Sequence, residues 1–225
     1  MNANTPVLEG VVGSQAYGLA GPGSDVDKLG VFVAPLKDLM SLHDYPETIV
    51  QNDPDLCYHE LRKFMKLAGK ANPTVLELLY LNDHTIASDD VGKKLVEHRD
   101  LFISQRIRKT YGGYALQQVK RLERRGDGSF KSKLRKRKAK HQRHIARLVI
   151  QCQFALEHGY IRVHLKDHEI ELVRRVEAMD DDELLEWFGD QDQKIQGIPS
   201  DLPEDADWSA INDLLLEFRR AQWTQ

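Results

Sequence analysis

The residues whose types and spacing most favour a catalytic role are two aspartates, two residues apart, that follow a Gly-Ser dipeptide. Asp25 and Asp27 close the stretch GSQAYGLAGPGSDVD, which begins with Gly13 and Ser14. On a β-strand, side chains two residues apart project from the same face, and two carboxylates held there repel each other unless a cation lies between them. Carboxylate oxygens suit Mg²⁺, which also coordinates substrate phosphates. Because glycine permits close approach of the backbone, the Gly-Ser turn can offer N–H groups and a hydroxyl to a phosphate. The pattern predicts a metal-assisted displacement at phosphorus.

The same stretch resembles the DNA polymerase beta-like nucleotidyltransferase superfamily, whose signature is a Gly-Ser turn followed at this spacing by Asp-x-Asp. Longer stretches resemble more narrowly the RNA-repair-pathway polymerase beta-like nucleotidyltransferase family of bacteria and phages. They are GSQAYGLAGPGSDVDKLGVFVAP, LRKFMKLAGKANPTVLELLY and KAKHQRHIARLVIQCQFALEHGYIRV. The resemblance covers roughly residues 7 to 175. Its motifs are specific for fold and catalytic class and unspecific for substrate.

The resemblance implies a role for each matching residue. Gly13 and Ser14 would contact the phosphates of the incoming nucleotide, and Asp25 and Asp27 would bind the catalytic metals. The expected ion is Mg²⁺, with Mn²⁺ as the alternative, and the expected nucleotide is an NTP, ATP first.

A third carboxylate on a neighbouring strand completes the two-metal site of this superfamily and helps to deprotonate the attacking hydroxyl. Two residues are candidates here: Asp55, which opens the expected strand DLCYHEL, and Glu60 near its end. A separation of five residues puts them on opposite faces of a regular strand, so only one can point at the metals. We favour Asp55.

Three other residues of these stretches allow a functional and a structural interpretation. Ser24 either steadies the aspartate pair as part of the nucleotide site or serves ordinary turn chemistry. Tyr17 either stacks on a nucleobase or packs the loop against the core. Asn72-Pro73 is typical of a capped helix start, and we expect Glu77 in that helix to be structural although it matches the family.

A polar stripe in a helix predicted over residues 133–158 is a second nucleotide-binding candidate. Lys140, His144 and Arg147 follow one another at i, i+4 and i+7. In the family-like interpretation the stripe faces the active-site cleft and holds the triphosphate or an acceptor phosphate. The alternative is an ordinary solvated helix face.

Charge is strongly segregated along a chain whose net charge is −3. Residues 106–147 hold 16 Lys and Arg against two acids, and residues 167–217 hold 17 Asp and Glu against three bases. The basic part contains the run KSKLRKRKAK, which suits nucleic-acid backbone but has no interleaved aromatic residues for base stacking. Its expected nucleic-acid-binding residues are Lys131, Lys133, Arg135, Lys136, Arg137 and Lys138. The alternative is that the acidic tail folds against the basic segment and neutralises it.

The elements that must position these residues change character along the chain. We expect strands over residues 7–12, 25–34 and 55–61, and short helices over 36–42, 62–69 and from 73. Later helices are expected over 90–98, 101–125, 133–158, 167–188 and 208–221, with 189–208 as a loop. The predicted fold is therefore α+β: a nucleotidyltransferase core over residues 1–86, with a mixed sheet and flanking helices, followed by a helical domain over 87–225.

Composition excludes several other classes. With 225 residues, 41% hydrophobic and 30% charged, the chain can bury a core and is not disordered. No apolar run approaches the roughly 18 residues of a membrane span, and the two cysteines do not form a disulfide framework. We therefore expect a cytoplasmic protein without a membrane partner. The sequence has no H-E-x-x-H motif, no histidine spacing for zinc that is supported by cysteine, no Walker loop and no G-x-S-x-G elbow.

These observations predict a Mg²⁺-dependent enzyme that transfers a nucleoside monophosphate from an NTP to a hydroxyl and releases pyrophosphate. The basic segment favours an RNA 3′ end, such as that of a damaged tRNA, as the acceptor. The alternatives are a protein hydroxyl, as in adenylylating antitoxins, and a small molecule. A degenerate nucleotide binder is less compatible with an intact Gly-Ser and Asp-x-Asp pattern.

Overall fold

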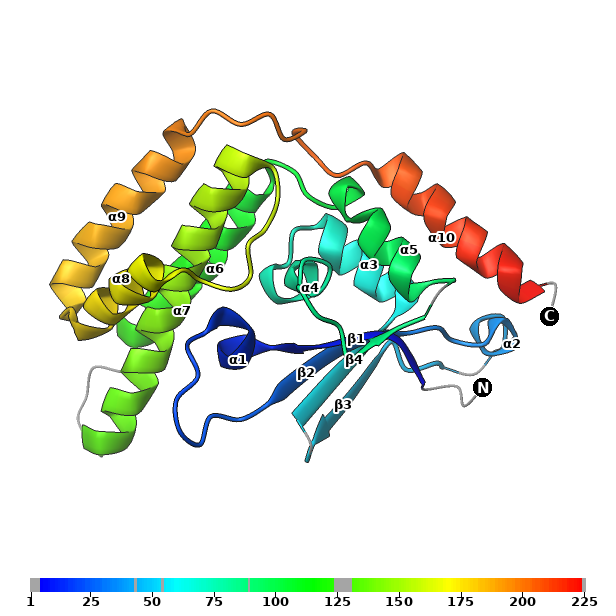
Figure 1. The fold of residues 1–225 in the computed structure, drawn as a ribbon, viewed down its shortest axis with the longest axis horizontal. Coiled ribbons are helices and arrows are strands. Elements are labelled where there is room, and N and C mark those ends of the chain that lie inside the picture. Colours follow the sequence, from blue (N-terminus) through cyan, green and yellow to red (C-terminus); the bar gives the residue numbers. More distant parts are fainter. Residues whose placement is uncertain (1–4, 43, 54, 89, 124–130, 224–225) are drawn as a thin grey trace. The chain divides into compact units, whose positions relative to one another are not determined.

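A computed structural model describes residues 5–42, 44–53, 55–88, 90–123 and 131–223 (Figure 1). They form two compact units, which we call the sheet unit (residues 1–104 and 203–225) and the helical unit (105–202). The combination of a mixed sheet with flanking helices and a set of further helices confirms the predicted α+β class. The boundary differs from the expected one at residue 86. The chain up to residue 104 stays with the sheet because apolar side chains such as Leu95 and Phe102 are fully buried there.

A five-stranded mixed sheet is the base of the sheet unit, with strand order β3-β4-β2-β1-β5. Its strands are β1 (Pro6–Val12), β2 (Asp27–Phe32), β3 (Thr48–Asn52), β4 (Asp55–Glu60) and β5 (Ile86–Ala87). β2 and β4 run parallel, and the other neighbouring pairs are antiparallel. The edge strands β3 and β5 were not anticipated from the sequence. β2 is shorter than expected, so Asp25 lies ahead of it in a loop.

The sheet unit also contains several short helices and one longer helix at its C-terminal end. They are α1 (Gly13–Tyr17), α2 (Leu36–Leu39), α3 (Leu61–Gly69), α4 (Pro73–Leu78), α5 (Gly92–Glu97), the 3₁₀ helix η1 (Arg99–Leu101) and α10 (Trp208–Trp223). Asn72 caps α4 by accepting a hydrogen bond from the Val75 N–H at 3.2 Å, as the Asn-Pro pair predicts.

Helices α3 and α4 cover one face of the sheet (Figure 1). Gly10 of β1 lies directly under the segment that follows α4, where a Cβ would come within 2.3 Å of Leu81. Its partner Leu29 on β2 is 3% exposed on the same face. Because side chains alternate along a strand, Asp27 shares this covered face with Leu29, and Lys28 occupies the opposite one.

On the opposite face, Tyr58 reaches across Gly30 to a buried glutamate. Gly30 pairs with Glu9 on one side and Tyr58 on the other, and a Cβ there would lie 2.8 Å from the Tyr58 ring. The Tyr58 hydroxyl donates to Glu9, which is 3% exposed, and Lys28 Nζ lies 3.0 Å from the same carboxylate. Burial by itself raises the pKa of Glu9, but the hydrogen bonds from Tyr58 and Lys28 outweigh it and leave that pKa below its ordinary value. This contact ties β4, β2 and β1 into one register.

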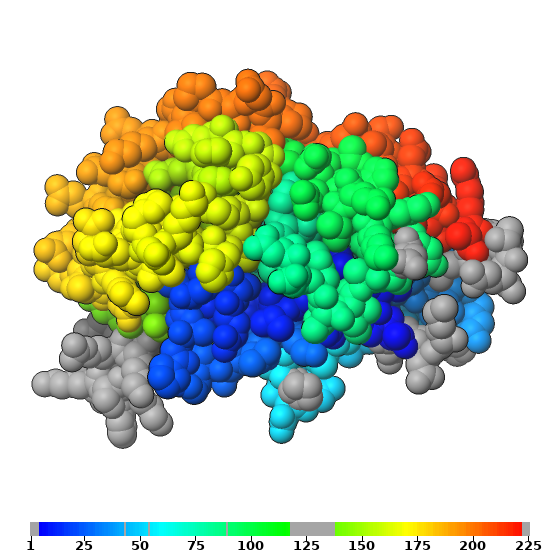
Figure 2. Space-filling model, in the orientation of Figure 1, coloured from blue at the N-terminus to red at the C-terminus, as the bar shows by residue number. Residues whose placement is uncertain are grey.

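Helix α10 returns to the sheet unit after the helical unit. The Trp208 ring covers Gly69 of α3, where a Cβ would lie 2.8 Å from the ring. Arg219 donates to the carboxylate of Glu60 and, at 3.3 Å, to the carbonyl of Ala34. Figure 2 shows α10, in orange and red, packed beside the green segment that holds α5 and η1. Helix α10 therefore belongs to the sheet unit, although it was expected to belong to the helical domain over residues 87–225.

The helical unit consists of α6 (Ile107–Glu123), α7 (Lys131–His158), α8 (Asp167–Ala178) and α9 (Asp181–Gly197). α9 extends through residues that were expected to form a loop. Acidic helices pack on the basic helix α7, where Lys138 lies 2.8 Å from Asp181 and Arg143 lies 3.9 Å from Glu177. The acidic segment thus neutralises the basic one at these two points.

Candidate active site

The Gly-Ser dipeptide begins α1, directly after the last residue of β1 (Figure 1). Gly13 has φ +72°, and a Cβ on it would lie 2.4 Å from Oδ2 of Asp27. α1 ends in a Schellman arrangement at Gly18: the Leu19 N–H donates to the Ser14 carbonyl at 2.9 Å, and the Gly18 N–H donates to the Gln15 carbonyl at 3.3 Å. Glycine at position 13 therefore allows both the positive φ of the turn and the close approach of Asp27.

Asp27 and Asp55 open two neighbouring parallel strands. Lys28 pairs with Leu56. The two aspartates, each one residue earlier, therefore stand side by side where β2 and β4 begin. Residues opposite one another in a parallel ladder point to the same face. Asp25 lies two residues ahead of β2 and is exposed, as is Asp55. The premise that Asp25 and Asp27 share one strand face is therefore wrong, because the strand begins only at Asp27.

Glu60, the other candidate for the third carboxylate, lies at the far end of β4 and is 4% exposed. Its Oε2 accepts from the Arg62 N–H at 2.8 Å, and its Oε1 accepts from Arg219 and from the Ala34 N–H at 3.4 Å. Both oxygens are thus engaged in capping α3 and in holding α10. This placement favours Asp55 as the carboxylate beside Asp27.

Ser24 and Tyr17, for which the sequence allowed two interpretations, both make structural contacts. The Ser24 hydroxyl accepts from the Gly21 N–H at 2.9 Å, which closes the turn ahead of Asp25. Tyr17 is 7% exposed, and its hydroxyl donates to Glu77 Oε2 at 2.7 Å. Tyr17 therefore packs α1 against the core and is not placed to stack on a base.

A thiol and an imidazole follow Asp55 on the same face of β4, and no motif in the sequence singles them out. Cys57 Sγ lies 3.8 Å from His59 Nε2, and His59 Nδ1 lies 3.0 Å from the Thr48 hydroxyl. Burial raises the pKa of the Cys57 thiol and lowers the pKa of the His59 imidazole. Both groups are therefore predominantly neutral at pH 7.

In the helical unit, the polar stripe on α7 is only partly solvated. Lys140 is exposed and His144 is half-buried, but Arg147 is 1% exposed. Arg147 donates to Gln151 Oε1 at 2.6 Å and lies 3.2 Å from His144 Nδ1. These residues therefore do not form a simple solvated helix face, because Arg147 is buried in the core of the helical unit.

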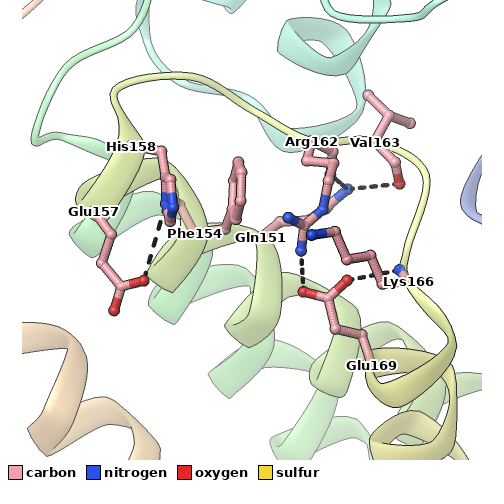
Figure 3. A network of polar contacts seen from close by, with 8 residues as sticks. All are labelled: Gln151, Phe154, Glu157, His158, Arg162, Val163, Lys166 and Glu169. Atoms are coloured by element: carbon pink, nitrogen blue, oxygen red, sulfur yellow. Dashed lines mark hydrogen bonds and ion pairs between the residues drawn. The ribbon is translucent and has the colours of Figure 1, made fainter.

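The same core continues into a stacked cluster at the end of α7 (Figure 3). The ring of Phe154 is parallel to that of His158, with centroids 4.1 Å apart, and the Arg162 guanidinium lies 3.8 Å from the Phe154 centroid. Arg162 also donates to Glu169, whose other oxygen accepts from the Lys166 N–H at 2.8 Å. These contacts fix the segment between α7 and α8.

Of the expected nucleic-acid-binding residues, only Lys138 has a described side chain, which pairs with Asp181. The side chains of the others lie outside the described residues, although their backbone forms the start of α7. They are Lys131, Lys133, Arg135, Lys136 and Arg137.

A metal group and a membrane span were both sought in the described part of the chain. No three His, Cys, Asp or Glu side chains within it form a group that could hold a metal ion, so Asp25, Asp27 and Asp55 are not assembled as they stand. None of its helices combines the length and apolar character needed to cross a bilayer.

Comparison with known proteins places the chain in a family. The model of the RNA repair pathway DNA polymerase beta family matches residues 5–197. An uncharacterized 38.9 kDa protein from the nrdC-mobD intergenic region of Enterobacteria phage T4 is 29% identical over an alignment of 126 residues, and the alignment covers 50% of this chain and 37% of the phage protein. A nucleotidyltransferase-like protein from Exiguobacterium sibiricum 255-15 shares 13% identity at a TM-score of 0.30, covering 97% of this chain and 68% of its own. The family match spans most of the sequence, and the chain belongs to the RNA repair pathway DNA polymerase beta family, among the polymerase beta-like nucleotidyltransferases.

Proposed function

We propose that the chain transfers a nucleoside monophosphate from an NTP to a hydroxyl group of RNA. The observation that carries this proposal is the contact of Gly13 with Asp27 beside Asp55. At this end of the sheet, a backbone turn that can bind phosphate lies next to two carboxylates that can bind a cation. Family membership supports the reaction class.

The residues fit a divalent cation in donor chemistry and in backbone placement. Asp25, Asp27 and Asp55 supply hard oxygen ligands, which Mg²⁺ and Mn²⁺ prefer, and two of them open neighbouring strands. These three carboxylates would hold the cation. When bound, it would neutralise charge on the phosphates and on the attacking oxygen.

The chain's own groups have separate tasks in the proposed reaction. The N–H groups of Gly13 and Ser14 bind and orient the triphosphate of the NTP. Asp55 accepts the proton of the acceptor hydroxyl, whose oxygen forms a bond to the α-phosphorus. The bond from that phosphorus to the bridging oxygen breaks, and pyrophosphate leaves with the electron pair. Catalysis is then mainly positioning and charge neutralisation.

An RNA 3′ end is the acceptor that the chain's composition favours. The run KSKLRKRKAK suits phosphate contact, and the family is described as belonging to an RNA repair pathway. Lys140 and His144 are the members of the α7 stripe proposed to contact a phosphate, with Arg147 orienting His144 from the core. ATP is the first nucleotide to test.

The test is transfer from each of four labelled NTPs with Mg²⁺ or Mn²⁺, offering total RNA and total cell protein separately. Asp27→Asn removes a proposed metal ligand. Asp53→Asn is its matched control, because Asp53 is an exposed acid two residues from Asp55 that the site does not use. We expect label on RNA, lost in Asp27→Asn and kept in Asp53→Asn.

Other outcomes would replace the proposal. Label on protein alone would identify a protein acceptor. No label in either pool, from any NTP, would exclude RNA as the acceptor and leave a small molecule or a binding protein. If RNA is bound through the basic run, neutralising Lys133, Arg135, Lys136 and Arg137 should reduce the slope of log affinity against log salt by about 3.

A further inference from the structure

A buried carboxylate outside the Asp-x-Asp pattern is attached to the Gly-Ser turn. Glu77 of α4 is fully buried, at 0% exposure, and its Oε2 accepts the Tyr17 hydroxyl at 2.7 Å. The two residues are 60 positions apart in the chain. Their hydrogen bond therefore joins α1, which carries Gly13 and Ser14, to a helix packed on the covered face of the sheet.

Tyr17 is the side chain by which α1 is anchored. Among the five residues of this short helix it alone is buried. The backbone of α1 is closed at one end by Gly13 against Asp27 and at the other by the Schellman arrangement at Gly18. Such a closed turn moves as one body, so the direction of the Tyr17 side chain sets the tilt of the whole turn.

A carboxylate is a costly choice for a position that only needs packing. Glu77 is flanked in the sequence by Val75, Leu76, Leu78 and Leu79, all of which are at most 3% exposed. Placing a carboxyl group there costs free energy that a leucine would not. The compensating property of a carboxyl group is that its oxygen accepts a short, strong hydrogen bond, which a leucine cannot do.

We propose that Glu77 is a positioning residue of the nucleotide site, which acts through Tyr17 to fix the orientation of the Gly13-Ser14 turn. This inference rests on the proposed function, in which that turn binds the triphosphate. Loss of the hydrogen bond lets the turn tilt away from the phosphates. Since the turn holds the triphosphate in the ground state and the transition state alike, the loss raises KM for the NTP more than it lowers kcat.

The test compares Tyr17→Phe with Tyr80→Phe. Tyr80 is also buried, at 6% exposure, in the same unit, but its hydroxyl donates to the Arg99 carbonyl at 3.4 Å, away from α1. Each variant loses one hydroxyl and no ring. We expect Tyr17→Phe to raise KM for the NTP by up to roughly tenfold, the upper value for one buried hydrogen bond. Tyr80→Phe should leave KM within about twofold and lower thermal stability less than Tyr17→Phe, because the Tyr80 hydrogen bond is longer and less buried.

A double-mutant cycle with Glu77→Gln tests whether the two residues act together. If Glu77 works through Tyr17, the effect of Glu77→Gln on KM should largely disappear in the Tyr17→Phe background. Additive effects, or equal values of KM in Tyr17→Phe and Tyr80→Phe, would overturn the proposal.

Hydrogen exchange separates this inference from the proposed function. Amide protons of residues 14–19 should exchange faster in Tyr17→Phe than in Tyr80→Phe, whether or not the protein transfers nucleotides. If the wild-type protein transfers no label but exchange rises in Tyr17→Phe, the proposed function fails while the attachment of the turn through Tyr17 stands. Unchanged exchange in that variant would refute the positioning role itself.

Discussion

Replacing Gly13 by alanine tests the contact that carries the proposed active site. Two penalties apply at this position. A φ of +72° costs a non-glycine residue about 1–2 kcal/mol. In addition, the new Cβ would lie 2.4 Å from Asp27 Oδ2, where ordinary contact begins at 3.4 Å, so that oxygen must retreat by about 1 Å.

Gly23 provides the matched control because it isolates the first penalty. Its φ is +79°, and a Cβ there meets nothing within 4 Å. Gly23→Ala should therefore lower the free energy of unfolding by about 1–2 kcal/mol without touching the carboxylate. Gly13→Ala should lose the same amount plus a further ~1 kcal/mol, the low end for overpacking, since the short Asp27 side chain can rotate away.

Activity should separate the two variants far more than stability does. Rotation relieves the clash but displaces the proposed metal ligand, and a misplacement of about 1 Å is worth roughly 100-fold in rate. We expect labelled NTP transfer to fall by about that factor in Gly13→Ala and to stay near the wild-type rate in Gly23→Ala. Urea denaturation of both variants supplies the stability difference. Equal transfer rates in the two variants would refute the argument that the approach of Gly13 to Asp27 sets the site.

Three further outcomes follow from the packing of the sheet unit. Because the pKa of Glu9 lies below its ordinary value of 4.5, its contribution to stability is present above that pH and is lost as the pH falls through the folded-state pKa. Glu9→Gln should therefore flatten the pH dependence of the unfolding free energy below pH 4.5. Arg219→Met leaves the buried Glu60 carboxylate without its cation and should cost about 3–5 kcal/mol in urea denaturation, much of it recovered in the double variant with Glu60→Gln. Gly69→Ala should displace the ring of Trp208, cost about 1–3 kcal/mol and shift tryptophan fluorescence; an unchanged emission spectrum would contradict the contact.

Local patterns were enough to predict the strand that holds Asp55 and the helix that follows Asn72, but not α1, which holds Gly13 and Ser14. Alternation in the strand beginning at Asp55 and the Asn72-Pro73 cap both depend on neighbouring residues, and the structure has β4 and α4 at those places. β3 was missed because TIVQN is short and lies at a sheet edge where three of its five residues are exposed, which leaves a weak pattern. The end of α9 was missed because Pro199, Pro203 and the acidic character of residues 189–208 are typical of a loop, while tertiary packing of Ile195 holds the helix to Gly197.

Long-range partners could not be predicted from one sequence. Nothing near Arg147 indicates that Gln151 will accept a hydrogen bond from its guanidinium inside a core, so the sequence left open whether the stripe faces a cleft or solvent. Similarly, no local feature assigns Glu60 to Arg219 or Glu77 to Tyr17. These pairs depend on how the chain returns to itself, which only the assembled fold specifies.

The return of α10 to the sheet unit has a consequence for biosynthesis. Glu60 and its partner Arg219 are 159 residues apart, and the whole helical unit is made between them. At a translation rate of about 5–20 residues per second, Glu60 leaves the ribosome roughly 10–30 s before Arg219 does. For that interval the nascent sheet has an acid at the end of β4 with no cation and an α3 surface not yet covered by Trp208. The newly made chain is therefore most open to proteases and chaperones at the end of the sheet that α10 finally closes.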